Sequence, residues 1–419
     1  MRSRFTALAV AAASAMALTI APALGGTTGT TASAADSTQA SPAGSYIVVL
    51  DDGALSRTIA AAHADRFGFE LGHVYTTALQ GYSATLTAET AALLEALPGV
   101  DWVQADAPVV ASAQTTPTGI NRVDADLSPT AAINGADQRV NVDVAVIDTG
   151  VDLDHPDLNV YRAGARNCSL FGISADDDHG HGSHVAGTIG ALDNTAGVVG
   201  VAPGARIWPV KVLSALGTGL NSDVICGIDY VAANADQIEV ANMSLGGAGE
   251  DDGNCGATND DAMHAAICEA VDNGITFVVA AGNDSADAST STPAAYDEVV
   301  TVSALADFNG QPGGGAASTC RADQDDSFAS FSNFGSDVDI IAPGVCIHST
   351  SMNGGYATLS GTSMAAPHVA GGAALYAANN ASATPAQVKA ALIGSGTTNW
   401  NDSDDPDNTQ EKLLNVSTY

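Results

Sequence analysis

Three residues of the chain, Asp148, His181 and Ser363, are of the types that together perform acyl transfer. A serine hydroxyl is a weak nucleophile until a base removes its proton, and an imidazole is the usual base. A carboxylate can hold that imidazole in one tautomer and stabilise the imidazolium that forms. Each residue alone has a more ordinary interpretation, so the prediction depends on a fold that brings the three together.

Ser363 lies in the stretch Gly361–Gly371, where a glycine-rich turn leads into an Ala-rich run that we expect to be helical to about Ala378. We expect Thr362 or Ser363 to cap that helix, with Pro367 in or just past its first turn, where a missing N–H costs little. A hydroxyl there faces unpaired backbone N–H groups and the positive end of the helix dipole, which favour a developing oxyanion. For a lone Gly-x-Ser, an ordinary N-cap serine is the better interpretation.

Asp148 and His181 each stand at the edge of an apolar segment. Asp148 ends the strand-like run Val144–Ile147, and Gly150 allows a sharp turn after it. A carboxylate at a buried strand end needs a partner, because its desolvation is otherwise prohibitive; alone, it would be a turn or cap residue. His181 belongs to a histidine cluster that enters an apolar helical run at His184. We predict that Asp148 holds one ring nitrogen of His181 and that the other nitrogen faces the serine.

Metal binding is the rival interpretation of this cluster, because His181 and His184 are three residues apart and can share one helix face. The acids nearby do not form a His-Glu-x-x-His pattern, which is the usual zinc signature on a helix. We therefore expect His181 to act as a base and His184 to be a buried structural residue.

The elements that must position these residues alternate between strands and helices from Ala113 onward. We expect strands at 142–147, 206–212, 240–243 and 275–281, and helices at 184–192 and 223–234. This alternation predicts an α/β domain with three layers, in which helices flank a mainly parallel sheet. Sites in such sheets lie at the carboxyl ends of the strands, where the candidate residues fall.

Residues 45–110 predict a separate, smaller α+β domain. The pattern gives a strand at 45–50, a helix at 54–68, a strand pair within 73–87, a helix at 89–97 and a strand at 100–103. This β-α-β-β-α-β order is typical of ferredoxin-like modules.

The charge of the chain limits its partners. The 419 residues carry a formal net charge of −34, and residues 113–419 hold 38 acidic against nine basic side chains. Such an excess argues against nucleic-acid binding. It fits cation binding or solubility in salty or alkaline surroundings, although a solvated acidic surface is the simpler interpretation for most of these residues. Outside the N-terminus, no apolar run reaches membrane-spanning length.

Residues 1–34 predict a signal peptide for secretion. Two arginines precede the apolar run of residues 5–24, and a small-x-small cleavage site ends at Ala34. An N-terminal membrane anchor is the alternative, but the run is Ala-rich, weakly hydrophobic and followed by a Gly/Thr/Ser tract. We expect a secreted, extracellular protein whose mature form is not attached to a membrane.

Export permits disulfides among the six cysteines, which allow fifteen pairings that sequence alone does not resolve. Pairing between neighbours, with Cys255–Cys268 and Cys320–Cys346 closing short loops, is our hypothesis. The sequence has no Cys-x-x-Cys, so we do not expect a zinc site.

Three segments resemble the active-site motifs of subtilisin-like serine peptidases of the secreted bacterial subtilisin or proteinase K type: Asp148–Gly150, His181–Thr188 and Gly361–His368. They occur in that family's order, Asp then His then Ser. The rival Gly-x-Ser-x-Gly hydrolase pattern fails, because Ala365 occupies the second glycine position. The resemblance implies a serine endopeptidase made as a self-processed zymogen, with Ser363 as nucleophile, His181 as general base and then acid, and Asp148 as the orienting carboxylate.

The resemblance covers essentially the whole chain and implies its domains. They are a signal peptide (1–34), a linker with an inhibitory propeptide (35–112, core 45–110) and a peptidase domain (113–419), joined near Ser112. The propeptide would act as an intramolecular inhibitor and folding aid. We expect polypeptide substrates and a monomer.

Further site residues follow from the same resemblance. Asn283, after Ala280-Ala281-Gly282, would donate to the oxyanion together with the Ser363 backbone N–H. The substrate would be held between two extended segments (Gly217, Thr218, Gly219; Ser244, Leu245, Gly246), as an added strand. Pro293 and Ala294 would form the floor of the main specificity pocket. With Ser291 and Thr292 beside them and no acid placed there, we expect a broad preference for apolar or aromatic residues.

A structural calcium ion is also implied, and no organic cofactor. Asp157 matches the family's ligand aspartate, and the remaining ligand positions are matched by Gln114, Leu192, Asn194, Ala196 and Val198. Oxygen ligands with one or two carboxylates suit a hard cation; loop residues without a metal are the alternative.

Two other functions compete with this one. A secreted binding protein that keeps the fold but is catalytically silent would usually lose a residue of the triad or the oxyanion site, and here all four are present. A metallopeptidase would lose its activity to a zinc chelator but not to serine-directed reagents.

Overall fold

A computed structural model describes residues 44–106, 113–170 and 172–419 of the chain. The chain divides into two compact units, Met1–Val110 and Ala111–Tyr419, which we describe separately. The predicted signal peptide and most of the linker, and the predicted junction near Ser112, lie outside the described residues. Among the residues that are described, no helix is long and apolar enough to cross a membrane.

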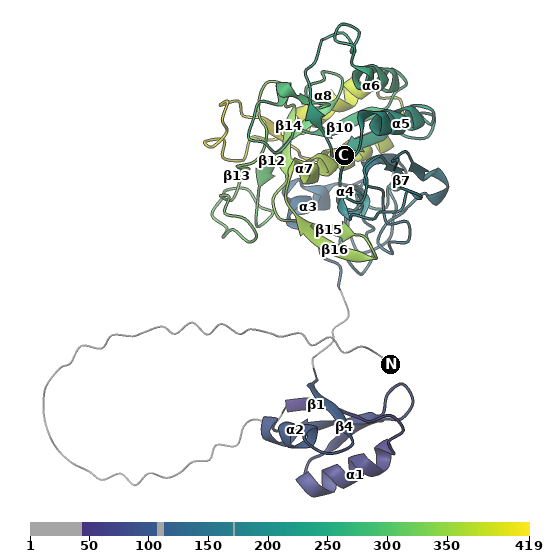
Figure 1. Cartoon of the computed structure of the whole chain (residues 1–419). Helices are drawn as coiled ribbons and strands as arrows, with labels where there is room; N and C mark the ends of the chain where they lie inside the picture. The colour runs from purple at the N-terminus through teal and green to yellow at the C-terminus, as the bar shows by residue number, and fades with distance from the viewer. Residues whose placement is uncertain (1–43, 107–112, 171) are drawn as a thin grey trace, which may run out of the picture. The chain divides into compact units, whose positions relative to one another are not determined.

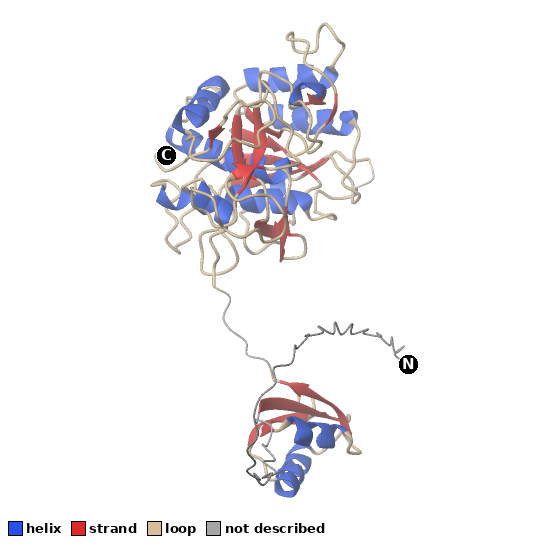
Figure 2. Cartoon of the chain, turned by 90° about the vertical axis from the view of Figure 1, so that its left-hand side faces the viewer, coloured by secondary structure: helices blue, strands red, loops and turns tan. Residues whose placement is uncertain are grey.

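The first unit has the predicted β-α-β-β-α-β order. Its elements are β1 (Gly44–Leu50), α1 (Ser56–Phe67), β2 (Leu71–Tyr75), β3 (Gly81–Leu86), α2 (Ala88–Glu95) and β4 (Val100–Ala105). The four strands form an antiparallel sheet in the order β2-β3-β1-β4. Val48, Leu50 and Tyr82 point from one sheet face into a core with Ala60 of α1 and Leu94 of α2, so both helices cover that face (Figure 2).

The second unit is built on one large, mainly parallel sheet (Figure 1). Its main path runs β17-β14-β12-β10-β8-β5-β7-β6, and β13 adds to β12 as its antiparallel neighbour. The strands are β5 (Asp143–Asp148), β6 (Arg166–Asn167), β7 (Arg206–Lys211), β8 (Val240–Met243), β10 (Thr276–Ala280), β12 (Val300–Ala306), β13 (Ser327–Phe328), β14 (Ile340–Pro343) and β17 (Lys412–Leu413). Two short pairs lie outside it: β9 (Gly247–Ala248) with β11 (Ser291–Thr292), and β15 (Ile347–Ser351) with β16 (Gly355–Leu359).

Helices cover both faces of this sheet, which gives the three predicted layers (Figure 2). They are α3 (Thr118–Arg122), α4 (His181–Gly190), α5 (Asn221–Ala232), α6 (Ala262–Asp272), α7 (Thr362–Asn379) and α8 (Pro385–Ser395). Strand β5 explains the arrangement, because successive side chains point to opposite faces. Val144 and Val146 join the core under α4 and α7, whereas Ala145 and Ile147 join the core under α5 and α6. A strand buried on both faces is expected to be apolar, and the four residues Val144–Ile147 between the terminal aspartates of this strand are.

All six cysteines are paired, and the pairing between neighbours is confirmed. The bridges are Cys168–Cys226, Cys255–Cys268 and Cys320–Cys346. The first ties the segment after β6 to helix α5, and the second ties the loop before α6 to that helix. Both therefore fasten loops to the helical layer around α5 and α6.

Candidate active site

Asp148 is the last residue of β5, at the carboxyl edge of the sheet, and it is completely buried. Its Oδ1 accepts the backbone N–H of Thr149 at 2.6 Å and lies 2.8 Å from Nδ1 of His181. Gly150, two residues on, has φ +98° and no room for a Cβ, which would lie 2.5 Å from the Ala175 carbonyl oxygen. The strand therefore ends in a turn that needs glycine at this position, as predicted.

His181 is the first residue of α4, and tight packing brings that helix end to Asp148. A Cβ on Gly182 would lie 2.0 Å from the Gly150 carbonyl oxygen, so only glycine permits the approach. The Gly182 N–H donates to the Thr149 hydroxyl at 2.9 Å. The imidazole Nδ1 consequently faces the Asp148 carboxylate, which fixes this nitrogen as the protonated one.

Asp177 organises the start of α4, a role that the sequence analysis did not assign. Its Oδ1 accepts the N–H groups of His179 and Gly180 at 3.0 and 2.9 Å, and its Oδ2 accepts the N–H and hydroxyl of Ser183. The carboxylate therefore satisfies N–H groups that the first helical turn leaves free. An Asp shortly before a glycine that precedes the helix, here Asp177 before Gly180, is the sequence signal that identifies such a cap.

Two opposing effects set the pKa of His181. Burial alone would lower it, but the charge and hydrogen bond of Asp148, and then the charge of Asp177, outweigh burial and raise the pKa above the ordinary value of 6.5. The protonated imidazole is thus stabilised in the place where a proton taken from a nucleophile would arrive.

Ser363 is the second residue of α7, and the predicted cap is wrong. The helix begins at Thr362, and the capping position is Gly361, which makes no side-chain cap. The Ser363 hydroxyl donates to the backbone carbonyl of Ser244 at 3.2 Å. Within the described residues it has no hydrogen bond to His181, although both side chains line one cavity. Such contacts are often loose in the absence of substrate.

Pro367 lies inside α7, where it removes the N–H that would bond to the Ser363 carbonyl four residues earlier. The Ser244 hydroxyl donates to that carbonyl instead, at 2.8 Å. Ser244 follows strand β8, so the sheet replaces the missing helix bond and anchors the residue that carries the predicted nucleophile. Sequence reasoning placed Ser244 beside the substrate but missed this second contact.

Asn283 follows β10, and its amide is oriented by Thr362. Its Oδ1 accepts the Thr362 N–H at 2.8 Å and the Thr362 hydroxyl at 3.1 Å. A backbone N–H can only donate, so the atom that faces it must be the amide oxygen, and Nδ2 is left as a donor. Buried Asn333 stabilises this turn. Its side-chain oxygen accepts the backbone N–H groups of Asp284 and Ala286, and its side-chain nitrogen donates to the Ala281 carbonyl.

Two cavities meet at Ser363. One, of about 500 Å³, is lined by His181, by Ser363 and by all six predicted substrate-segment residues at 217–219 and 244–246. The other, of about 440 Å³, is lined by Asn283, Ser363 and small side chains that include Ala281 and Ala294. The exposed acid Asp284 lines it too, contrary to the expectation that no acid lies there, whereas the predicted floor residue Pro293 does not line it.

His184 is completely buried, as predicted, and does not converge with His181 on a common point. Its Nε2 lies 3.0 Å from the Ile347 carbonyl oxygen and 3.2 Å from that of Ala357, in strands β15 and β16. Burial lowers the pKa of His184 to about 4, so the ring is neutral and donates to these carbonyls. It ties α4 to the β15–β16 pair.

The six predicted calcium-ligand residues lie together. The Gln114 amide is 2.6 Å from the Leu192 carbonyl oxygen and 3.1 Å from that of Val198. Asp157 accepts from Asn194 at 2.8 Å and from the Val198 N–H at 2.9 Å. Ala196 donates to the Asn194 side-chain oxygen at 2.7 Å, which completes the group.

Comparison with known proteins identifies the family. Residues 139–412 match the model of the Subtilase family, and residues 45–112 match Peptidase inhibitor I9. The chain is 39% identical to subtilisin E of Bacillus subtilis (strain 168) over 318 residues, or 75% of each chain. It is 40% identical to a subtilisin of Bacillus pumilus over 288 residues, which cover 68% of this chain and 93% of the relative. A solved cold-adapted subtilisin-like serine proteinase matches with a TM-score of 0.52 at 35% identity, over 71% of this chain and 97% of the other.

The chain therefore belongs to the subtilase family and is a subtilisin-like serine proteinase that carries its own I9 inhibitor propeptide. The predicted fold class is confirmed. Polypeptides are its substrates, and the propeptide is an intramolecular inhibitor.

Proposed function

We propose that Ser363, His181 and Asp148 form the catalytic triad of a secreted endopeptidase. His181 Nε2 takes the proton of the Ser363 hydroxyl as the oxygen attacks the scissile carbonyl, and later gives it to the leaving amine. Asp148 keeps the proton on Nδ1 and stabilises the imidazolium. The acyl-enzyme is then hydrolysed by water through the same steps. The observation that carries this proposal is the 2.8 Å contact of His181 with buried Asp148, in a cavity that His181 shares with Ser363.

The oxyanion would be stabilised by the Asn283 Nδ2 group and the Ser363 backbone N–H. Thr362 supports this role, because its N–H and hydroxyl occupy the amide oxygen of Asn283 and leave the nitrogen available. Loss of such a side-chain donor costs roughly 100- to 1,000-fold in turnover, a magnitude measured in this family.

Specificity would follow from the two cavities. The segments at 217–219 and 244–246 would hold the substrate backbone as an added strand. The cavity floored by Ala281 and Ala294 would then take the side chain before the scissile bond. Its small, mostly uncharged lining favours broad cleavage after apolar or aromatic residues.

The group around Asp157 fits a structural calcium ion. Its members offer one carboxylate, two side-chain amides and backbone carbonyls, all of them oxygen donors of the kind that calcium prefers. A half-turn of the Gln114 amide would present its oxygen to the same point as the carbonyls of Leu192 and Val198. When bound, the ion would supply positive charge that fixes these loops, with no part in the chemistry.

The maturation route is part of the same proposal. The signal sequence at 1–34 supports secretion, and the I9 domain supports synthesis as a zymogen that cuts itself near Ser112.

Hydrolysis of a peptide p-nitroanilide series by the processed protein tests the triad. Ser363→Ala and His181→Ala should each lower kcat by about 10⁴-fold or more, with little change in KM. His348→Gln, an exposed histidine on β15, is the matched control and should keep wild-type kinetics. A Ser363→Ala protein that retains its turnover would contradict the assignment.

A further inference from the structure

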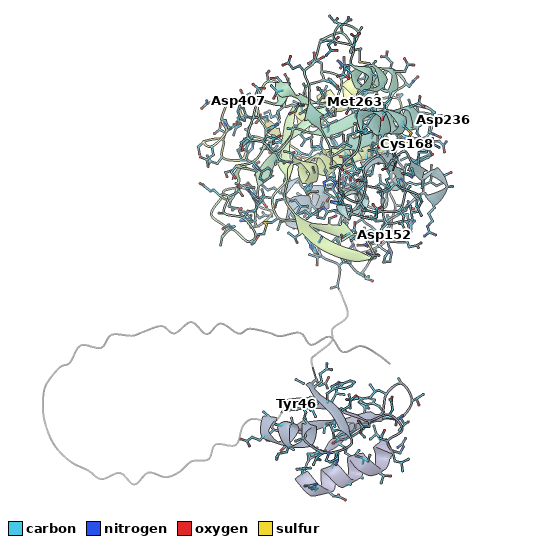
Figure 3. All side chains as sticks on the ribbon, viewed as in Figure 1. Tyr46, Asp152, Cys168, Asp236, Met263 and Asp407 are labelled. Atoms are coloured by element: carbon cyan, nitrogen blue, oxygen red, sulfur yellow. A yellow bond between two sulfur atoms is a disulfide. The ribbon has the colours of Figure 1, made fainter. Side chains whose placement is uncertain are left out.

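Three carboxylates converge in the loop between Trp400 and strand β17. Asp405, Asp407 and Glu411 each offer an oxygen to a cluster whose members all lie within 4.8 Å of one another. Residues 401–411 contain five acids and no Lys, Arg or His. Figure 3 shows Asp407 at the periphery of the second unit.

Burial separates this cluster from an ordinary acidic surface loop. Asp405 is 4% exposed and Glu411 is 6% exposed, so both side chains are more than nine-tenths buried. Asp405 Oδ2 and both side-chain oxygens of Glu411 accept from no N–H or hydroxyl group among the described residues, so that these oxygens of the two carboxyl groups have only each other. A buried ionised carboxylate without a partner is strongly destabilising, and two that face each other are more so.

We propose that Asp405, Asp407 and Glu411 bind a calcium ion, separate from the group around Asp157. A divalent cation is the ligand that compensates three negative charges while occupying the unpartnered oxygens. Oxygen-only donors exclude a preference for soft metals. Calcium–oxygen distances of about 2.3–2.6 Å allow ligand oxygens up to about 5 Å apart, which this cluster satisfies. An irregular loop suits calcium better than magnesium, which demands near-octahedral geometry.

The site would close the C-terminal loop of the peptidase domain onto the sheet. The Trp400 indole N–H donates to the Glu411 carbonyl at 3.0 Å, and Trp400 packs with Leu413 of β17 in a small core. Strand β17 is the last strand on the path of the large sheet, beside β14, and its Leu413 also forms an isolated antiparallel bridge with Thr397. A cation on Glu411 therefore fastens the residue that precedes this edge strand.

The rival explanation is a carboxyl pair that shares one proton between Asp405 and Glu411. Such a pair needs no metal, and it would be stabilised equally with or without calcium. The two explanations predict different effects of Glu411→Gln on calcium binding and on stability, because the glutamine keeps the shape of the side chain but removes its negative charge.

The test uses the full chain with Ser363→Ala, so that self-digestion does not interfere, and counts calcium bound at equilibrium by atomic emission. Glu411→Gln and Asp405→Asn should each lose one ion per chain, whereas Asp404→Asn, an exposed acid of the same loop, should lose none. In a calcium chelator, the unfolding midpoint of Glu411→Gln should equal or exceed the parent's, because like-charge repulsion is relieved. Adding calcium should raise the unfolding midpoint of Glu411→Gln by a few degrees less than it raises that of the parent.

Equal ion counts and equal calcium-dependent gains in the parent and Glu411→Gln would overturn the proposal, as would the same count and gain with magnesium alone. A second measurement leaves the loop unmutated, in case a variant does not fold. Terbium added to the Ser363→Ala/Asp157→Asn chain should emit on selective excitation of tryptophan, since Trp400 contacts Glu411, and calcium should abolish the emission. No sensitised emission would also overturn the proposal.

Discussion

At the scale of single residues, the site depends on groups outside the proposed triad. Asp177 is the clearest case, because it caps the helix that carries His181 and also raises the pKa of that imidazole. Ser244 and Thr362 act similarly on Ser363 and Asn283. The geometry of the proposed triad and oxyanion site is set by hydrogen bonds between loops that follow different strands.

Asp177→Asn should move the acid limb of the kcat/KM–pH profile to lower pH. His181 must be neutral to accept a proton, so activity is lost as pH falls through its pKa, which Asp148 and Asp177 hold above 6.5. Removing the Asp177 charge lowers that pKa, whereas the asparagine oxygen can still accept one of the two sets of donors, either the N–H groups of His179 and Gly180 or the groups of Ser183. Peptide hydrolysis measured over the pH range checks this, and a limb that stays in place or moves upward would contradict it.

Thr362→Val should lower kcat by roughly 5- to 100-fold with little change in KM. The substitution removes the hydroxyl that bonds to Asn283 Oδ1 and to the Gly282 N–H, a loss of about 1–3 kcal/mol for buried partners. Thr362→Ser keeps the hydroxyl and should stay near wild-type activity. If valine and serine variants behave alike, Thr362 does not orient the amide.

At the scale of elements, close approach between α4 and α7 brings His181 and Ser363 into one site. Gly371 of α7 lies against the end of α4 and the segment after it, because a Cβ there would be 3.2 Å from the carbonyl oxygen of Ile189 in α4 and 2.6 Å from Cβ of Val201 beyond it. The sheet edge fixes Asp148, and these two helices bring their N-termini to it.

Gly371→Ala should destabilise the protein by about 1–3 kcal/mol through overpacking. Gly394→Ala is the matched control on exposed α8, where no atom lies within 4 Å of the added Cβ. Alanine is the better helix former there, so this change should stabilise by about 0.4–1 kcal/mol. Denaturant unfolding in the Ser363→Ala background measures both, and equal effects would show that the helices can separate freely.

The elements and most of the candidate site were predictable from local patterns. Strand β5 is predictable from the unbroken apolar run that leads to Asp148. Helix α5 is predictable from the spacing of its apolar residues. The start of α7 was not predictable, because Gly361 precedes the helix in extended backbone while Asn283, distant in sequence, takes the Thr362 N–H. Asn333 and the second role of Ser244 were missed for the same reason: their partners are chosen by tertiary packing.

At the scale of the whole molecule, negative charge dominates. The chain carries 47 acidic and 13 basic residues, so its folded form concentrates like charges. The negative charge of several acids is stabilised locally, because their carboxylates accept hydrogen bonds from backbone N–H groups. Asp252, for example, accepts from the N–H groups of Thr258 and Gly256. Repulsion among the remaining acidic side chains can be screened by salt.

Raising sodium chloride from low concentration to about 1 M should increase the free energy of unfolding by on the order of 1 kcal/mol, because the Debye length falls to about 3 Å. The measurement is denaturant unfolding of the Ser363→Ala chain with calcium held constant, so that screening is separated from metal binding. Stability that falls with salt would mean that ion pairs outweigh the acidic repulsion.

Activation of Ser363 as a nucleophile by His181 can be measured with a fluorophosphonate probe, which reacts with activated serine hydroxyls. Peptide mapping after labelling of the processed protein should find the adduct on Ser363, labelling should slow strongly in His181→Ala, and the Ser363→Ala protein should take up none. A processed protein that is not labelled, or labelling that persists unchanged in Ser363→Ala, would contradict the account.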